Sequence, residues 1–103
     1  MNETLSPVNY DGSIGKNFPK YVSHKEVWAL EIKSITYGNL GGALLSFEDP
    51  RFEPINVTAD YIKKHDPRDN GMRWEGGYYV IYEDGYKSWS PTEAFEKGYT
   101  LIK

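Results

Sequence analysis

Cysteine is absent from the 103 residues of this chain. Its absence excludes a disulfide-stapled scaffold and any metal site built on thiolate ligands. Long apolar runs are missing too, since no stretch approaches the ~20 apolar residues of a membrane-spanning helix. Residues 1–10 also lack the basic start and the apolar run of a signal peptide. We therefore expect a cytoplasmic protein with no membrane partner.

A basic excess is also lacking. The formal net charge is −3 and the sequence pI is about 5.3, so duplex nucleic acid is not an expected partner. One segment departs from this balance, with four cations diluted by two acids: Lys63, Lys64, Arg68 and Arg73, with Asp66 and Asp69. Two interpretations stay open for it: a solvated loop of mixed charge, or a patch that binds phosphate groups.

Recognisable catalytic patterns are missing as well. The two histidines, His24 and His65, are far apart in sequence, and neither has the spacing of a metal ligand. No serine stands in a nucleophile elbow, and the acidic residues form no metalloprotease motif and no calcium-binding loop. The glycine pairs at 41–42 and 76–77 lack the lysine and helix of a phosphate-binding loop. We expect no enzyme activity, no metal and no cofactor.

The strongest local pattern in the chain is the C-terminal stretch, residues 76–100. Asp84-Gly85 lies between two runs of aromatic and β-branched residues, which predicts a β-hairpin with a two-residue type I′ turn. In this register Tyr82 pairs with Lys87 and Val80 pairs with Trp89. Because side chains alternate along a strand, one face of the hairpin should carry Tyr78, Val80, Tyr82, Lys87 and Trp89 together.

A helix is predicted directly after this hairpin. Ser90-Pro91-Thr92-Glu93 has the pattern of a capping box, with Ser90 as the N-cap and Pro91 as the first helical residue. Gly98 is expected to end the helix in the left-handed conformation. Residues 99–102 then form a short closing strand.

The whole chain divides into an N-terminal arm, residues 1–18, and a single domain, residues 19–103. The arm has scattered apolar residues without a strand or helix period, so we expect it to lie against the domain or against a second copy. Apolar and β-branched residues predict strands at 25–37, 43–47 and 55–57, and Thr58 is expected to cap a helix over 59–65. The fold class is therefore α+β: a small sheet of about five mostly antiparallel strands with two short helices.

Aromatic side chains are abundant, with nine Tyr, three Trp and four Phe. They are either half-buried filler, with tyrosine hydroxyls reaching solvent, or part of a binding surface in which rings and cations hold a ligand. For the second interpretation, the ligand-binding residues that the hairpin register predicts are Arg73, Trp74, Tyr78, Tyr82, Lys87 and Trp89.

The segment GGYYVIYEDGYKSWSPTEAFEKGYT, together with PKYVSHKEVWALEIKSI, resembles a family of small uncharacterised bacteriophage and prophage proteins. The resemblance covers residues 19–102 and implies a phage origin and an accessory role, but no particular activity. The layout of the C-terminal stretch is also similar to that of a phage anti-defence family whose oligomeric members sequester the signalling nucleotides of bacterial immunity. Asp84-Gly85, Trp89, Ser90 and Tyr99 carry this second likeness.

Two functions remain as hypotheses. The first is a non-enzymatic phage counter-defence factor, a homo-oligomer in the cytosol of the bacterial host that sequesters a small nucleotide or blocks a host defence protein. The cluster of cations and aromatic residues favours this hypothesis. The alternative is a structural or assembly protein of the virion, in which the N-terminal arm would connect neighbouring subunits.

Overall fold

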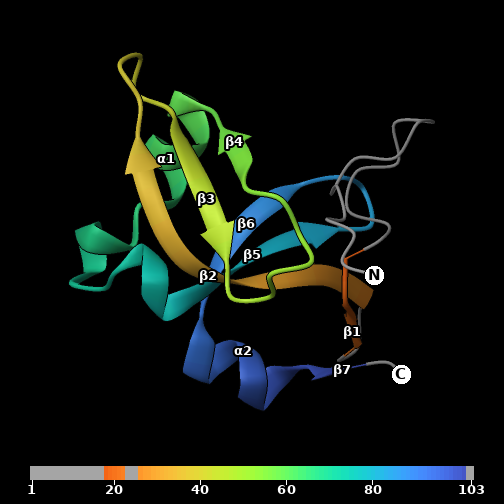
Figure 1. Cartoon of the computed structure of the whole chain (residues 1–103). Coiled ribbons are helices and arrows are strands. Elements are labelled where there is room, and N and C mark those ends of the chain that lie inside the picture. The colour runs from red at the N-terminus through yellow and green to blue at the C-terminus, as the bar shows by residue number, and fades with distance from the viewer. Residues whose placement is uncertain (1–17, 23–25, 102–103) are drawn as a thin grey trace.

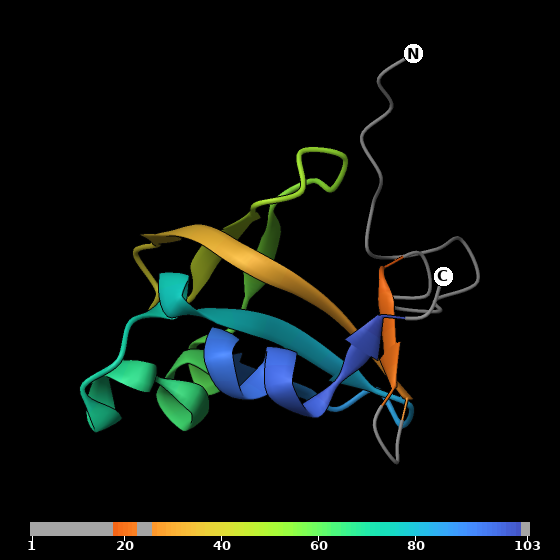
Figure 2. The same ribbon diagram turned by 90° about the horizontal axis from the view of Figure 1, so that it is seen from below.

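The computed structural model describes residues 18–22 and 26–101 of the chain. Over these residues it confirms the α+β class, with antiparallel strands and two short helices (Figures 1 and 2). The strands are β1 (Lys20–Val22), β2 (Glu26–Tyr37), β3 (Ala43–Phe47), β4 (Ile55–Val57), β5 (Gly77–Tyr82), β6 (Lys87–Pro91) and β7 (Thr100–Leu101). The helices are α1 (Ala59–His65) and α2 (Thr92–Gly98), and two 3-10 turns, η1 (Pro67–Asn70) and η2 (Trp74–Gly76), precede β5.

Strand β2 belongs to both halves of the sheet. Residues 27–31 pair with β5 and residues 26–28 also pair with β1, whereas residues 32–37 pair with β3. The register shifts between Ile32 and Ser34, and an irregularity of this kind bends a strand. The strand order β6-β5-β2-β3-β4 therefore folds over a common interior. At its ends, α1 follows β4 and contacts β6, where the Tyr61 hydroxyl donates to the Ser88 carbonyl at 2.8 Å.

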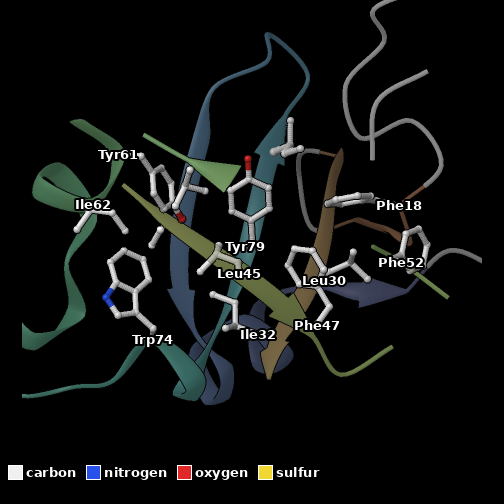
Figure 3. Close-up of a cluster of buried hydrophobic side chains, with 13 residues drawn as sticks. Phe18, Leu30, Ile32, Leu45, Phe47, Phe52, Tyr61, Ile62, Trp74 and Tyr79 are labelled. Atoms are coloured by element: carbon white, nitrogen blue, oxygen red, sulfur yellow. The ribbon is translucent and has the colours of Figure 1, made fainter. Parts of the chain in front are cut away.

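The interior between the two halves of the sheet is rich in aromatic rings (Figure 3). Phe18 is buried there and meets the rings of Phe47 and Phe52 edge-on, at centroid distances of 6.0 and 5.4 Å. The sequence pattern places Phe18 in the N-terminal arm, but its side chain belongs to the core. Residues 1–17, and with them the expected packing of the arm, lie outside the described residues.

A second buried cluster lies on the other face of β5, beneath α2. Phe95 of α2 stacks on Tyr78 at 4.2 Å and on Tyr99 at 4.7 Å between ring centroids. The cluster also includes Val27, Ala29 and Val80. Both faces of β5 are thus buried, one in each cluster, and this explains why apolar and aromatic residues run along it without alternation.

The predicted register of the β5–β6 hairpin is wrong by one residue. The structure pairs Tyr79 with Trp89 and Ile81 with Lys87. The loop is longer than predicted: the Gly85 amide donates to the Tyr82 carbonyl, and only Gly85 has positive φ, at 89°. Type I′ needs positive φ at Asp84 as well, whereas a three-residue loop closed by a left-handed glycine does not. The slip moves Lys87 and Trp89 to the face opposite Tyr78 and Tyr82.

The predicted capping box at α2 is also wrong. Ser90 and Pro91 are the last residues of β6, and α2 begins at Thr92 with Pro91 as N-cap and no side-chain capping bond. Pro91 is tolerated because it ends an edge strand, where no partner needs its missing N–H. Gly98 is the last helical residue and lacks positive φ, so the predicted left-handed ending is wrong too.

The predictions for the middle of the chain are confirmed. Strands β2, β3 and β4 begin and end within one residue of the predicted ranges. Thr58 caps α1, because its hydroxyl oxygen accepts from the Tyr61 amide at 3.1 Å.

Candidate functional site

The two tryptophans of the predicted binding surface are structural. Trp74 is only 1% exposed and packs between Tyr61 and Trp89, with ring centroids 5.7 and 6.4 Å away. Trp89 is half-buried, and its indole N–H donates to the Trp74 carbonyl at 3.2 Å. The Trp74 ring therefore has no face available for stacking with a ligand.

The two predicted tyrosines lie on the α2 side of the hairpin. Tyr78 is 6% exposed and its hydroxyl donates to the Glu96 carboxylate at 2.8 Å. Burial, first of all, and this bond raise the pKa of Tyr78 well above its ordinary value. Tyr82 is half-buried and stacks on Tyr86 at a centroid distance of 6.0 Å. Of the tyrosines predicted to bind a ligand, only Tyr82 reaches the surface.

The two predicted cations, Arg73 and Lys87, are separate from these rings. Arg73 is exposed just before η2 and borders a shallow surface hollow together with Met72, Glu75 and Gly76. Lys87 lies opposite Ile81, on the face that carries Trp89, and its ammonium approaches the Gly85 carbonyl at 3.4 Å. The six predicted residues thus do not form one surface, because the hairpin register differs from the predicted one.

A different group of cations and aromatic rings does come together, around the end of α1. The Lys64 ammonium lies 4.9 Å from the centre of the Tyr86 ring, and the Tyr86 hydroxyl is 3.3 Å from His65 Nε2. The His65 ring also packs against Tyr61. Burial, first of all, and the neighbouring Lys64 lower the pKa of His65, which favours the neutral imidazole. This contact forms because the fold brings α1 to the loop between β5 and β6. No local pattern in the sequence predicts it.

Beside this group is an open hollow of about 350 Å³. It is bordered by Lys64, His65, Asp66, Pro67, Asp69, Asn70, Met72, Trp89 and Pro91. Next to it, Arg68 is held by Asp66 through bonds of 2.9 and 2.7 Å, and this pairing lowers the pKa of the Asp66 carboxyl. Because one of its two arginines is already paired with a carboxylate, this segment fits the mixed-charge loop better than a phosphate-binding patch.

The described part of the chain was also searched for side chains that could hold a metal ion. There, no group of three or more His, Asp or Glu side chains is placed to hold a metal ion. No helix among the same residues is long and apolar enough to cross a membrane.

The most conspicuous surface feature is the loop between β2 and β3, residues 38–42, together with the outer face of β2, β3 and β4. Leu40 in this loop is 93% exposed, and Leu44 is 36% exposed. Thr36 and Asn56 flank Leu44 as its direct partners on the neighbouring strands. No charged residue occurs between Ser34 and Phe47. We call the loop and this outer face, formed by Ser34, Thr36, Leu40, Leu44, Ser46 and Asn56, the neutral surface.

No protein-family model matches the chain, and no curated protein matches it. A solved structure does: the NMR solution structure of the monomeric form of the phage L decoration protein. The two chains are 28% identical, the match covers 82% of this chain, and the TM-score is 0.57. The matched region spans 60% of the length of the phage L protein.

This match corrects the leading functional hypothesis. The anti-defence hypothesis depends on the order of elements in the C-terminal stretch and on four residues expected to share one hairpin face, with Arg73 and Trp74 at its entrance. The similar solved structure is instead that of a phage decoration protein. It supports the expected phage origin and favours the alternative hypothesis, a virion structural or assembly protein, over an inhibitor of bacterial immunity.

Proposed function

We propose that this chain is a structural protein of a phage virion that binds to the outside of the capsid. The observation that carries the proposal is the 28% identity to the phage L decoration protein over most of this chain, with the same fold. The partner is then the assembled coat protein of a phage, and the chain acts by binding to it without a chemical reaction.

The surface of the chain supports this proposal. A protein that binds another protein needs exposed apolar side chains in a charge-poor setting, because charged residues are depleted at the centres of protein interfaces. The neutral surface has this composition, although 26% of all residues in the chain are charged. The aromatic residues that suggested a nucleotide site have a structural role instead, since most of them fill the two buried clusters.

Sedimentation with purified capsids tests the proposed function. The fluorescently labelled chain is mixed with capsids of phage L that lack their own decoration protein, and with capsids of the phage that encodes the chain. We expect it to sediment with at least one of them in a sucrose gradient and to saturate at a fixed number of copies per capsid. Capsids of an unrelated phage serve as the control. A chain that stays at the top of every gradient, at concentrations far above that of the coat protein, would contradict the proposal.

Several copies are expected on each capsid, because a capsid presents the same coat-protein surface many times. Self-association in solution is a separate property, and light scattering of the purified chain measures it. The proposal predicts repeated, equivalent binding positions on the shell whether the free chain is a monomer or an oligomer.

A further inference from the structure

We infer that the neutral surface is the part of this chain that contacts the coat protein, with Leu40 as its apolar anchor. This inference rests on the proposed function and adds to it the face that binds and the chemistry of the partner. The partner surface should be uncharged and should have an apolar hollow that receives the Leu40 side chain.

The Leu40 side chain is exposed, and the loop that carries it is held in place. Leu40 is 93% exposed, the most exposed of the large apolar residues that the structure describes. Its loop is nevertheless closed by a hydrogen bond from the Gly38 amide to the Gly42 carbonyl at 2.9 Å. Figure 1 shows this loop, between β2 and β3, projecting from the sheet at the top of the view. Because the loop backbone is already held, binding a partner has to order only the Leu40 side chain and not the loop.

The glycines of the loop show how it is held. Gly41 has φ of 87°, a conformation that favours glycine, and a Cβ there would lie 3.1 Å from the Ala59 Cβ. A Cβ at Gly42 would lie 2.6 Å from the Val57 carbonyl oxygen. The loop backbone therefore lies directly against the end of β4 and the start of α1. This packing fixes the position of Leu40 relative to the whole domain.

The neutral surface is formed by two segments without charged residues. The run from Ser34 to Phe47 and the run from Pro54 to Ala59 contain no charged residue. Three exposed residues, Thr36, Leu44 and Asn56, form one continuous row across β2, β3 and β4. The strands of a half-exposed sheet ordinarily alternate buried apolar residues with polar ones on the solvent side. Here the solvent-side residues are polar but uncharged and include the apolar Leu44, so the partner surface that matches them best is uncharged as well.

The hollows of the described residues bear on whether Leu40 meets the coat protein or a second copy of this chain. A protruding leucine needs a complementary apolar hollow. Two hollows on the described residues are bordered partly by charged side chains: Lys64, Asp66 and Asp69 in one, Arg73 and Glu75 in the other. Because these charges would face an uncharged leucine, we take a different protein, the coat protein, as its partner.

The test compares two exposed leucines in the sedimentation assay. In Leu40→Asp a charge enters the neutral surface, and in Leu101→Asp the same change is made at the other end of the molecule, on β7, where Leu101 is 42% exposed. We expect Leu40→Asp to weaken capsid binding by at least about tenfold and Leu101→Asp to leave it within about twofold. Thermal melts of both variants establish that each stays folded.

Salt dependence gives an independent readout. Binding through an uncharged surface should change by less than about threefold between about 0.05 and 0.5 M salt, because there is little charge to screen. Strong weakening by salt, together with loss of binding in Lys64→Glu, would move the contact to the basic segment and overturn the inference. So would wild-type binding by Leu40→Asp, an equal loss in both leucine variants, or a drop in solution mass on Leu40→Asp that identifies a second copy as the occupant. If the wild-type chain itself binds no capsid, the proposed function fails and the inference fails with it.

Discussion

Replacing Gly77 by alanine should damage the hydrophobic core although its backbone conformation suits any residue. Gly77 has an extended conformation with φ of −155°, which any residue adopts. Its hydrogen, however, faces the indole of Trp89, and an added Cβ would overlap three atoms of that ring. The indole is held in place by its bond to the Trp74 carbonyl and by edge-on packing against the Trp74 ring. Either Trp89 or β5 must therefore move.

The expected cost has two parts. Forcing one extra carbon into a packed interior costs about 1–3 kcal/mol, and losing the Trp89–Trp74 hydrogen bond costs about 1 kcal/mol more. The free energy of unfolding should thus fall by about 2–4 kcal/mol. In a domain of this size that corresponds to a decrease in Tm of roughly 10–25 °C.

Thermal and urea unfolding followed by circular dichroism measure this cost, and Gly76→Ala is the matched control. A Cβ at Gly76 meets nothing within 4 Å, so this change should stay within about 0.5 kcal/mol of the wild type. Trp89→Ala removes the ring that Gly77→Ala would hit, and in that background the glycine change should cost less than about 1 kcal/mol. Equal stability of Gly77→Ala and Gly76→Ala, or an unchanged cost in the Trp89→Ala background, would refute the packing argument.

Three further predictions concern stability. Tyr61→Phe leaves the Ser88 carbonyl without the bond at 2.8 Å that joins α1 to β6, and should cost about 1–2 kcal/mol in urea unfolding. Thr58→Ala removes the N-cap of α1 and should cost about 1 kcal/mol in the same assay. Glu31→Gln should raise Tm at pH 7, because burial and then the charge of Glu96 raise the pKa of the Glu31 carboxyl above its ordinary 4.5. A raised pKa means that ionisation opposes folding, so this gain should vanish below about pH 4.5.

Each of these has a control that the structure supplies. Tyr86→Phe removes an exposed hydroxyl contact of 3.3 Å to His65 and should leave stability within about 0.5 kcal/mol of the wild type. Ser90 lies in β6 and caps no helix, so Ser90→Ala should cost clearly less than Thr58→Ala. A larger loss in either control than in its partner would contradict the assigned contacts. A Glu31→Gln gain that is the same at pH 7 and at about pH 4 would exclude the ionisation of Glu31 as its cause.

The sequence predicted those elements whose patterns are local. Strand β2 and the Thr58 cap follow from alternation and from one side chain that bonds three residues ahead. The hairpin shows the limit of such reasoning. Asp84-Gly85 fits a two-residue turn and a three-residue loop equally well, and in the structure Trp89 pairs with Tyr79, which requires the second. This shift of one residue moves the side chains of β6 to the opposite face from the predicted one.

The predicted binding surface failed for the same reason. Trp74, Tyr78 and Trp89 were grouped through that register, whereas the structure assigns Tyr78 to one buried cluster and the tryptophans to the other. The absence of charge between Ser34 and Phe47 is visible in the sequence. That this uncharged segment forms a continuous surface follows only from the structure, in which β4 pairs with β3 and places Thr36, Leu44 and Asn56 in one exposed row.

Electron cryomicroscopy of phage capsids incubated with the purified chain tests the central claim, capsid binding, most directly. We expect added density at repeated, equivalent positions on the outer surface of the shell, with the loop of residues 38–42 directed toward the coat protein. Capsids that look the same with and without a saturating amount of the chain would contradict it.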